Sequence, residues 1–212
     1  MMVAKATIVA GEHELPDDAH ARIAAALVAE GEGERALFDR EASAARAVAW
    51  LYRSAAPAAR VQQLLGRIPG VRGLAIYEVE ATDVHGAHHA PPPADERGRL
   101  HAVPGIRKVT FHRRLPDVTR DEYLRRFRWH GAIAEVHHSN AGRYRQNEVT
   151  NYIGPPERSA DGVSEHWYAS VDYALEHHFA RADSPQVVSD DVAEWLDRST
   201  AVGGYARVWH WS

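Results

Sequence analysis

The order of strands and helices predicted in the second half of the chain constrains the fold more than any other feature. Short runs rich in β-branched and aromatic residues, each bounded by turn residues, predict four strands there. They span residues 106–113, 142–153, 165–171 and 205–211. A capping box formed by Thr119 and Glu122 opens a helix that runs to about residue 138. A second helical region precedes the last strand, and we expect it to break near Ser184 and Pro185 and to restart at Ser189.

The resulting order, β-α-β-β-α-β, is the split βαβ arrangement of ferredoxin-like folds. The first half predicts the same order less clearly. Its strands are expected at residues 5–10, near 36–39, at 46–53 and at 74–80, with helices after Pro16 and Pro57. Residues 46–53 fit either a helix or a strand, and we favour the strand. The two halves share no convincing residue repeat, so an α+β fold of tandem ferredoxin-like repeats is inferred from element order alone.

Residues 81–103 divide the chain. This stretch holds Pro91, Pro92 and Pro93 together with several glycines and alanines, and it lacks any sustained hydrophobic period. Polyproline segments act as stiff spacers, so we interpret it as a linker. The predicted domains are a degenerate ferredoxin-like half at 1–80, the linker at 81–103, and a second ferredoxin-like half at 104–212.

Charge, cysteine content and hydropathy exclude several classes of function. A net charge of -4 with no basic run argues against a nucleic-acid partner. The sequence has no cysteine, which excludes disulfides, a thiolate nucleophile, Cys-ligated zinc and iron–sulfur clusters. No stretch approaches the roughly 18 apolar residues that a membrane helix needs, and the start of the chain lacks the pattern of a signal peptide. We therefore expect a cytoplasmic protein without a membrane partner.

Five residues of the helix that follows Thr119 fall on one helical face, the face that a helix turns toward its sheet. They are Tyr123, Phe127, His130, Ala134 and His137. Because histidine titrates near neutrality, His130 in a partly apolar cavity could pass a proton to or from a carbon acid. The alternative is that His130 is a core residue whose ring bonds a backbone carbonyl or a neighbouring strand.

Four short segments of the second half, at residues 119–130, 142–147, 165–168 and 191–196, together resemble the EthD-like family of dimeric α+β barrel proteins. The run at 119–130 ends in a motif similar to that family's W-x-x-H-A helix motif with shortened spacing. Residues 142–147 are similar to its G-x-R-Y-x-Q-N strand entry, residues 165–168 to its third strand, and residues 191–196 to its D-x-x-x-F-L segment. The resemblance covers about half of the chain, and each motif by itself is short.

The resemblance implies two sheets packed into a barrel with helices outside, so the complete fold expected is a pseudo-dimeric α+β barrel. Most members pair two chains, and here the first half would supply the second sheet, although a homodimer stays possible. The functions it implies are those of small-molecule cyclases, dehydratases, decarboxylases and isomerases, or of accessory proteins in ether degradation. Fold does not choose among them.

Strand residues supply the partners of His130. Alternation puts His112 on one face of its strand with Lys108, and it gives Tyr144 and Asn147 opposite faces of theirs. Tyr144 could donate to a developing enolate and Asn147 could polarise a carbonyl, although sheet packing is the alternative for Tyr144 and a turn or ladder cap is the alternative for Asn147. Glu165 shares a face with Trp167 and could be a base of raised pKa if it is buried beside that indole.

Metal and cofactor motifs are missing. Fourteen histidines invite a metal hypothesis, but His130 and His137 are two helical turns apart, and the adjacent histidine pairs point in different directions. No nucleotide-binding or serine-hydrolase motif occurs. We therefore predict no metal and no cofactor.

The function expected is that of a cofactor-independent lyase or isomerase acting on a hydrophobic or aromatic carbonyl compound. The catalytic residues would be His130, His112, Tyr144 and Asn147, and the substrate would contact Tyr123, Phe127, His137, Glu165 and Trp167. One alternative is a non-catalytic binding or accessory protein of an oxygenase system. The other is a cofactorless or haem-assisted monooxygenase.

Overall fold

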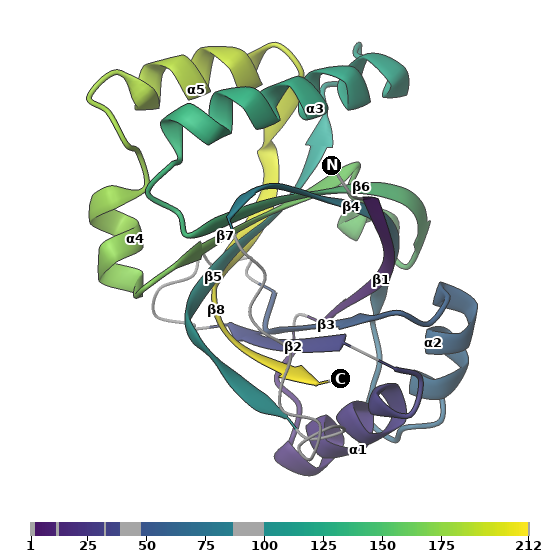
Figure 1. Ribbon diagram of the computed structural model, residues 1–212. Helices are drawn as coiled ribbons and strands as arrows, with labels where there is room; N and C mark the ends of the chain where they lie inside the picture. The colour runs from purple at the N-terminus through teal and green to yellow at the C-terminus, as the bar shows by residue number, and fades with distance from the viewer. Residues whose placement is uncertain (1–2, 12, 32, 39–47, 87–99, 212) are drawn as a thin grey trace.

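The structure is a computed structural model that describes residues 3–11, 13–31, 33–38, 48–86 and 100–211. Within these ranges eight strands and five α-helices alternate along the chain (Figure 1). The first half contains β1 Val3–Gly11, α1 Asp17–Val28, β2 Gly33–Phe38, β3 Trp50–Ser54, α2 Ala58–Leu65 and β4 Ala75–Gly86. The second half contains β5 His101–Arg114, α3 Arg120–His137, β6 Arg143–Ile153, β7 Gly162–Tyr168, α4 Val171–His177, α5 Ser184–Ala193 and β8 Leu196–Trp211.

The strands close into one antiparallel barrel. Their order around it is β1-β3-β2-β8-β5-β7-β6-β4. Each half contributes a four-stranded sheet in the ferredoxin-like order, β4-β1-β3-β2 and β8-β5-β7-β6. Two antiparallel seams join the halves, β2 with β8 from Gly33 opposite Trp211, and β4 with β6 from Ile76 opposite Ile153. The predicted fold of tandem ferredoxin-like repeats forming an α+β barrel is confirmed.

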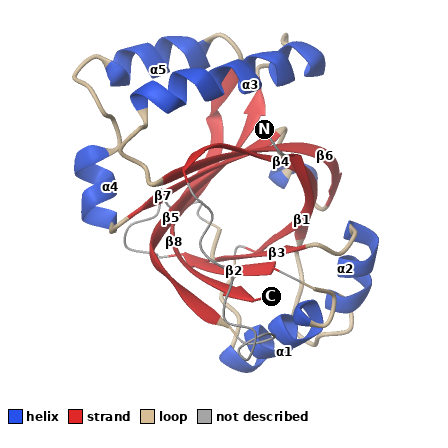
Figure 2. Cartoon of the chain, viewed as in Figure 1, coloured by secondary structure: helices blue, strands red, loops and turns tan. Residues whose placement is uncertain are grey.

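The helices lie on the outside of the barrel (Figure 2). Helices α1 and α2 pack together over the first half, whereas α3 and α5 pack together over the second half and α4 contacts β7. None of the described helices is long and apolar enough to span a membrane. Two separate layers between helix and sheet result, one in each half.

Alternation along the strands gives the barrel an apolar core and gives the first helix layer another. Inside the barrel, side chains from all eight strands pack together, including Ile8, Leu51, Val109, Val163 and Val208. Under α1 and α2 a second apolar cluster forms from the opposite strand faces. It contains Val9, Ile23, Leu27, Trp50, Tyr52, Val61, Leu65, Ile76 and Trp211. The two clusters bury opposite faces of the same sheet.

Some predicted boundaries are wrong. Residues 81–86 and 101–103 of the expected linker belong to β4 and β5, while 87–99 lie outside the described residues, as do the outer ends of the strands expected at 36–39 and 46–53. The second helical region is interrupted between His177 and Ser184, as expected, but α5 restarts at Ser184 rather than at Ser189. Pro185 sits in the first turn of α5, where its missing N–H has no intrahelical partner to lose. Strand β7 ends at Tyr168, and β8 begins at Leu196 rather than at Tyr205.

Candidate functional site

The barrel wall of the second half carries different chemistry on its two faces. Side chains of neighbouring residues on β5, β6 and β7 point alternately to the helices and to the barrel lumen. The pairs, with the helix-facing member first, are Lys108 and Arg107, Tyr144 and Arg145, and His166 and Glu165. The expected alternation on β5 is confirmed, since Val109 and Phe111 join the barrel core while His112 faces α3.

Helix α3 turns a mixed aromatic and histidine face toward this wall. Thr119 caps its N-terminus by accepting a hydrogen bond from the Glu122 N–H at 3.3 Å. Four members of the predicted face are buried, and the fifth, His137, lies at its edge and bonds Ser184 Oγ at 2.8 Å. The stripe expected from the sequence is therefore present, and His137 belongs to the contact with α5.

His130 is held by a carboxylate from another helix. Its Nδ1–H donates to Asp191 Oδ2 of α5 at 2.7 Å, and the ring is 6% exposed. Its ring centroid lies 5.7 Å from that of Trp195 and 6.5 Å from that of Tyr144. A carboxylate at Nδ1 fixes the tautomer and orientation of the imidazole, which leaves Nε2 as the atom able to take or give a proton.

His112 lies in the same layer with both ring nitrogens occupied. Nδ1 is 3.2 Å from the Tyr123 hydroxyl and Nε2 is 3.1 Å from Ser164 Oγ. Burial, with a smaller effect of His130, lowers the pKa of His112 to about 3. Gly162 permits this packing, because a Cβ there would collide with the Tyr123 hydroxyl and the His112 ring. His112 is therefore a neutral group that positions Tyr123 and Ser164.

A hydrogen-bonded chain runs beside the end of α3. The Tyr168 hydroxyl is 2.6 Å from His178 Nδ1, and His178 Nε2 is 3.1 Å from Lys108 Nζ. Burial lowers the pKa of His178 to about 2 and that of Lys108 to about 8. His138 Nδ1–H donates to the His178 carbonyl at 3.0 Å, and burial lowers the pKa of His138 to about 4. These histidines are neutral at physiological pH.

His166 occupies the centre of the layer without a polar partner. Both ring nitrogens are buried, and neither bonds any described residue. The ring stacks on Tyr144 with a centroid distance of 4.4 Å and meets His138 edge to face at 5.0 Å. Burial raises the pKa of Tyr144 to about 12, so its hydroxyl keeps its proton. The layer thus combines a fixed histidine, a protonated phenol and an unpartnered imidazole.

The remaining predicted residues lie on the opposite face of the wall. Asn147 Nδ2 donates to Glu165 Oε1 at 2.8 Å, and its Oδ1 accepts from Arg53 Nη2 at 2.9 Å. Trp167 points into the lumen, where the Arg107 guanidinium lies 4.4 Å from its ring centroid. The sequence therefore predicted one site from residues that the structure divides between two compartments.

The raised pKa expected for Glu165 is wrong. The carboxylate is almost fully buried, and burial by itself would raise its pKa. Ion pairs with Arg53 and with Arg107, the latter at 2.7 Å, outweigh that effect and hold the pKa of Glu165 below its usual range. Glu165 is thus a structural anion of the lumen and not a base.

Two further features bear on ligand access. A pocket of about 250 Å³ opens at one mouth of the barrel, with Arg53, Arg143 and Arg145 among its lining residues, and His130 does not line it. Trp129, which opens the helix motif, is 66% exposed on the outer face of α3. It therefore does not belong to the His130 layer.

Sequence reasoning missed Asp191 as a partner of His130, and it also missed Lys108, His138, His166 and His178 as members of this layer. Strand parity carried a signal for two of them, because Lys108 shares the face of His112 and His166 has the parity opposite to Glu165. Within the ranges that the structure describes, no three His, Asp or Glu side chains gather so that they could hold a metal ion.

Comparison with known proteins shows the fold and nothing finer. No protein-family model and no curated protein matches the sequence. An anthrone oxidase-like protein matches with a TM-score of 0.54 and 9% identity, covering 98% of this chain and 90% of that chain. A protein from Fusobacterium nucleatum subsp. nucleatum, provisionally assigned as a monooxygenase, matches with a TM-score of 0.52 and 10% identity, covering 98% and 92%. These likenesses show a dimeric α+β barrel fold, and membership in the EthD-like family stays a prediction.

Proposed function

We propose that this protein is an enzyme that moves a proton to or from a carbon next to the carbonyl of an aromatic or hydrophobic small molecule. The observation that carries the proposal is the 2.7 Å bond between His130 Nδ1 and Asp191 Oδ2, inside a layer of aromatic rings. A histidine fixed by a carboxylate is the usual arrangement of an acid/base group, since its second nitrogen is then presented in one tautomer.

The residues around His130 suit the charge that such a reaction develops. Removing a proton next to a carbonyl forms an enolate, which a protonated phenol can stabilise by donating a hydrogen bond. Tyr144 fits this role, because its ring centroid lies 6.5 Å from that of His130 and its raised pKa keeps the proton in place. The surrounding rings of Trp195 and Phe127 match a flat, apolar substrate.

Within this class we propose a cofactor-independent lyase or isomerase, of cyclase, dehydratase or decarboxylase type, related to the EthD-like family. A cofactorless monooxygenase is the second candidate. It begins with the same proton removal, after which the enolate reacts with dioxygen, and the two structural matches described as anthrone oxidase-like and as a monooxygenase favour it. His130 does not fit the role of a haem ligand, because its ring packs against buried Trp195 and Tyr144.

Proton exchange into anthrone tests the shared step without knowledge of the overall reaction. Anthrone carries acidic C–H bonds in an aromatic carbonyl compound, so the enzyme incubated with it in D₂O without oxygen should speed the exchange of these protons, measured by NMR. The variant His130→Gln keeps a hydrogen-bonding group and should lose roughly 10² to 10⁴ of the rate. The matched control is His20→Gln, which replaces a buried histidine of the first half. This variant should catalyse the proton exchange of anthrone at the wild-type rate.

Admission of oxygen separates the two candidates. Consumption of dioxygen with formation of the quinone, lost in His130→Gln, supports the monooxygenase, whereas exchange without oxygen consumption supports the lyase or isomerase. Equal rates for the wild type and His130→Gln would contradict the assignment of His130 as the acid/base. In that case a non-catalytic binding or accessory protein becomes the better interpretation.

A further inference from the structure

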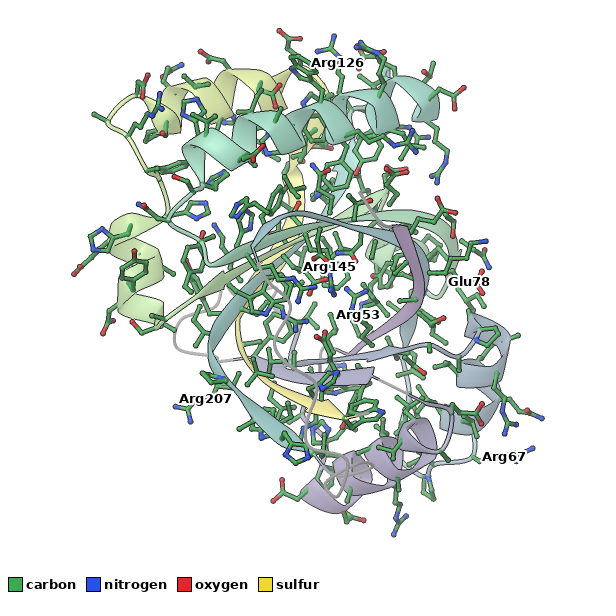
Figure 3. All side chains as sticks on the ribbon, viewed as in Figure 1. Arg53, Arg67, Glu78, Arg126, Arg145 and Arg207 are labelled. Carbon is green, nitrogen blue, oxygen red and sulfur yellow. The ribbon has the colours of Figure 1, made fainter. Side chains whose placement is uncertain are left out.

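The lumen of the barrel contains a buried charge network at one mouth that the proposed function does not use. Its members come from the starts of β2 and β6, from the ends of β3 and β4, and from the middle of β5 and β7. The cations are Arg53, Arg107, Arg143 and Arg145, and the anions are Glu34, Asp83 and Glu165. Figure 3 shows Arg53 and Arg145 inside the barrel, whereas Arg207 points away from it.

Among the residues that the structure describes, this network contains four arginines and three carboxylates. Burial by itself would raise the pKa of each acid, but hydrogen bonds and charge from the arginines outweigh it. They hold the pKa of Asp83 at about 2 and the pKa values of Glu34 and Glu165 below their usual range. All three carboxylates are therefore ionised near neutral pH. Within this described set, one guanidinium has no carboxylate of its own, and a buried charge without a full partner is costly.

Arg145 is the arginine that has no carboxylate of its own. Arg143 binds Asp83 through two nitrogens, at 2.8 and 2.9 Å. Arg107 binds Glu34 at 2.9 Å and Glu165 at 2.7 Å. Arg145 donates only Nε–H to Asp83, at 3.0 Å, and neither of its Nη atoms bonds a described residue. Its guanidinium lies 5.6 Å from the Trp167 ring centroid, which helps to fix its plane.

The pocket at this mouth gives a ligand access to Arg145. It has a volume of about 250 Å³, and Arg53 and Arg143 also line it. Ala6 and Val103 contribute apolar walls to the same pocket. Lys5, Glu34 and His210 line it as well, so the space combines several cationic groups and one carboxylate with apolar sides.

We infer that the mouth of the barrel binds a small organic monocarboxylate, whose two oxygens accept hydrogen bonds from Arg145 while its apolar part lies against Ala6 and Val103. A planar fork of two N–H donors matches a carboxylate in a bidentate way. One carboxylate matches the guanidinium of Arg145, whereas a doubly charged phosphate would place a second negative charge beside the Glu34 carboxylate of the same pocket. This site goes beyond the proposed function, because it lies on the lumen face of the wall and His130 lies on the helix face.

Calorimetric titration with benzoate tests the inference, with acetate, phosphate and chloride added in parallel at constant ionic strength. The wild type should bind benzoate more tightly than acetate, because the ring gains apolar contact, and should bind phosphate and chloride more weakly than either. Arg145→Gln should weaken benzoate binding by roughly tenfold to a hundredfold, the worth of hydrogen bonds to a charged group. The control variant Arg207→Gln, which replaces an exposed arginine of β8, should bind benzoate with the wild-type affinity.

Arg145→Lys keeps the positive charge but removes the paired N–H donors. It therefore distinguishes bidentate hydrogen bonding from charge attraction alone. It should fold and still lose about tenfold in affinity, because an ammonium is a point charge without the paired donors. Benzoate affinity that is unchanged in both Arg145 variants, or a wild type that binds no benzoate, would overturn the inference. Tighter binding of phosphate than of benzoate would overturn the monocarboxylate assignment. The measurement involves no turnover, so its result is independent of the role of His130.

Discussion

The two helix layers of this barrel have the same topology but contain different chemistry. Under α1 and α2 the layer is an apolar core built from residues such as Ile23, Leu27 and Trp50. One buried histidine of that layer, His20, bonds the Tyr52 hydroxyl at 2.9 Å. Under α3 to α5 the corresponding space holds many buried polar rings. They include His112, His130, His138 and His166, together with Tyr123, Tyr144 and Tyr168, and the half-buried His178 adjoins them.

This difference indicates that the fold does not require polar groups in the layer between the helices and the sheet. The first half shows that an apolar layer satisfies the same arrangement of helices and strands. Burying neutral imidazoles instead costs stability wherever a ring nitrogen lacks a partner, as at His166. Groups with strongly shifted pKa values that are not needed for folding cluster at functional sites. We therefore locate the chemistry in the second half.

Acidification should produce the largest effect, and it should act on the second layer. Burial holds the pKa values of His112 and His138 at about 3 and about 4, below the roughly 6.5 of an unfolded chain, so the unfolded state binds more protons as the pH falls below 6.5. Each residue then costs about 2 kcal/mol of unfolding free energy between pH 7 and pH 5, or about 4 kcal/mol together. Denaturant titrations at both pH values measure this, and His138→Gln should reduce the loss by the share of that residue, about 2 kcal/mol. Equal stability at the two pH values would refute buried neutral histidines.

Truncation in the first layer should cost stability without costing chemistry. Ile23→Ala removes a fully buried side chain and should lower the free energy of unfolding by about 3 kcal/mol. Anthrone exchange per folded molecule should stay as in the wild type, because Ile23 lies in the layer opposite to His130. Exchange that falls in well-folded Ile23→Ala would break the comparison, since it would assign chemistry to the first half.

Loss of the carboxylate behind His130 should have an intermediate effect on rate. Asp191→Asn removes the charge that fixes the ring at 2.7 Å, and outer partners of a histidine are typically worth roughly tenfold to a hundredfold in activity. The exchange rate at saturating anthrone should fall by this factor. Asp190→Asn changes the exposed neighbour on the same helix and is the matched control. A similar rate in both variants would make Asp191 a packing residue only.

Replacing a histidine in each layer by leucine should produce the smallest effects, and they should have opposite signs. His166→Leu removes two buried nitrogens that have no partner among the described residues, and should raise the free energy of unfolding by about 1 kcal/mol. His20→Leu removes the partner of Tyr52 and should lower it by about 1 kcal/mol. Thermal and denaturant melts of both variants test the pair. A change of the same sign in both would mean that the two layers do not differ in hydrogen bonding.

The sequence allowed the fold to be predicted because hydrophobic patterns and turn residues are local signals. The order of elements, the alternation on β5 and the buried stripe of α3 all followed from spacing along the chain. The partners of the site did not, because they are distant in sequence. Asp191, which orients His130, lies 61 residues from it in the sequence. Arg53, which helps to lower the pKa of Glu165, lies 112 residues from that carboxylate. No pattern of neighbouring residues could therefore indicate either pair.

Closure of the barrel within one chain has a consequence for its assembly. Both seams, β2 with β8 and β4 with β6, join strands of the same polypeptide, so barrel formation is a unimolecular step. Where two separate chains build such a barrel, dilution would pull the halves apart, and the melting temperature would depend on protein concentration. In this protein the two seams therefore do not make the melting temperature depend on protein concentration. Any change in melting temperature on dilution would therefore report a contact between copies on the outer surface, away from both compartments that the barrel wall separates.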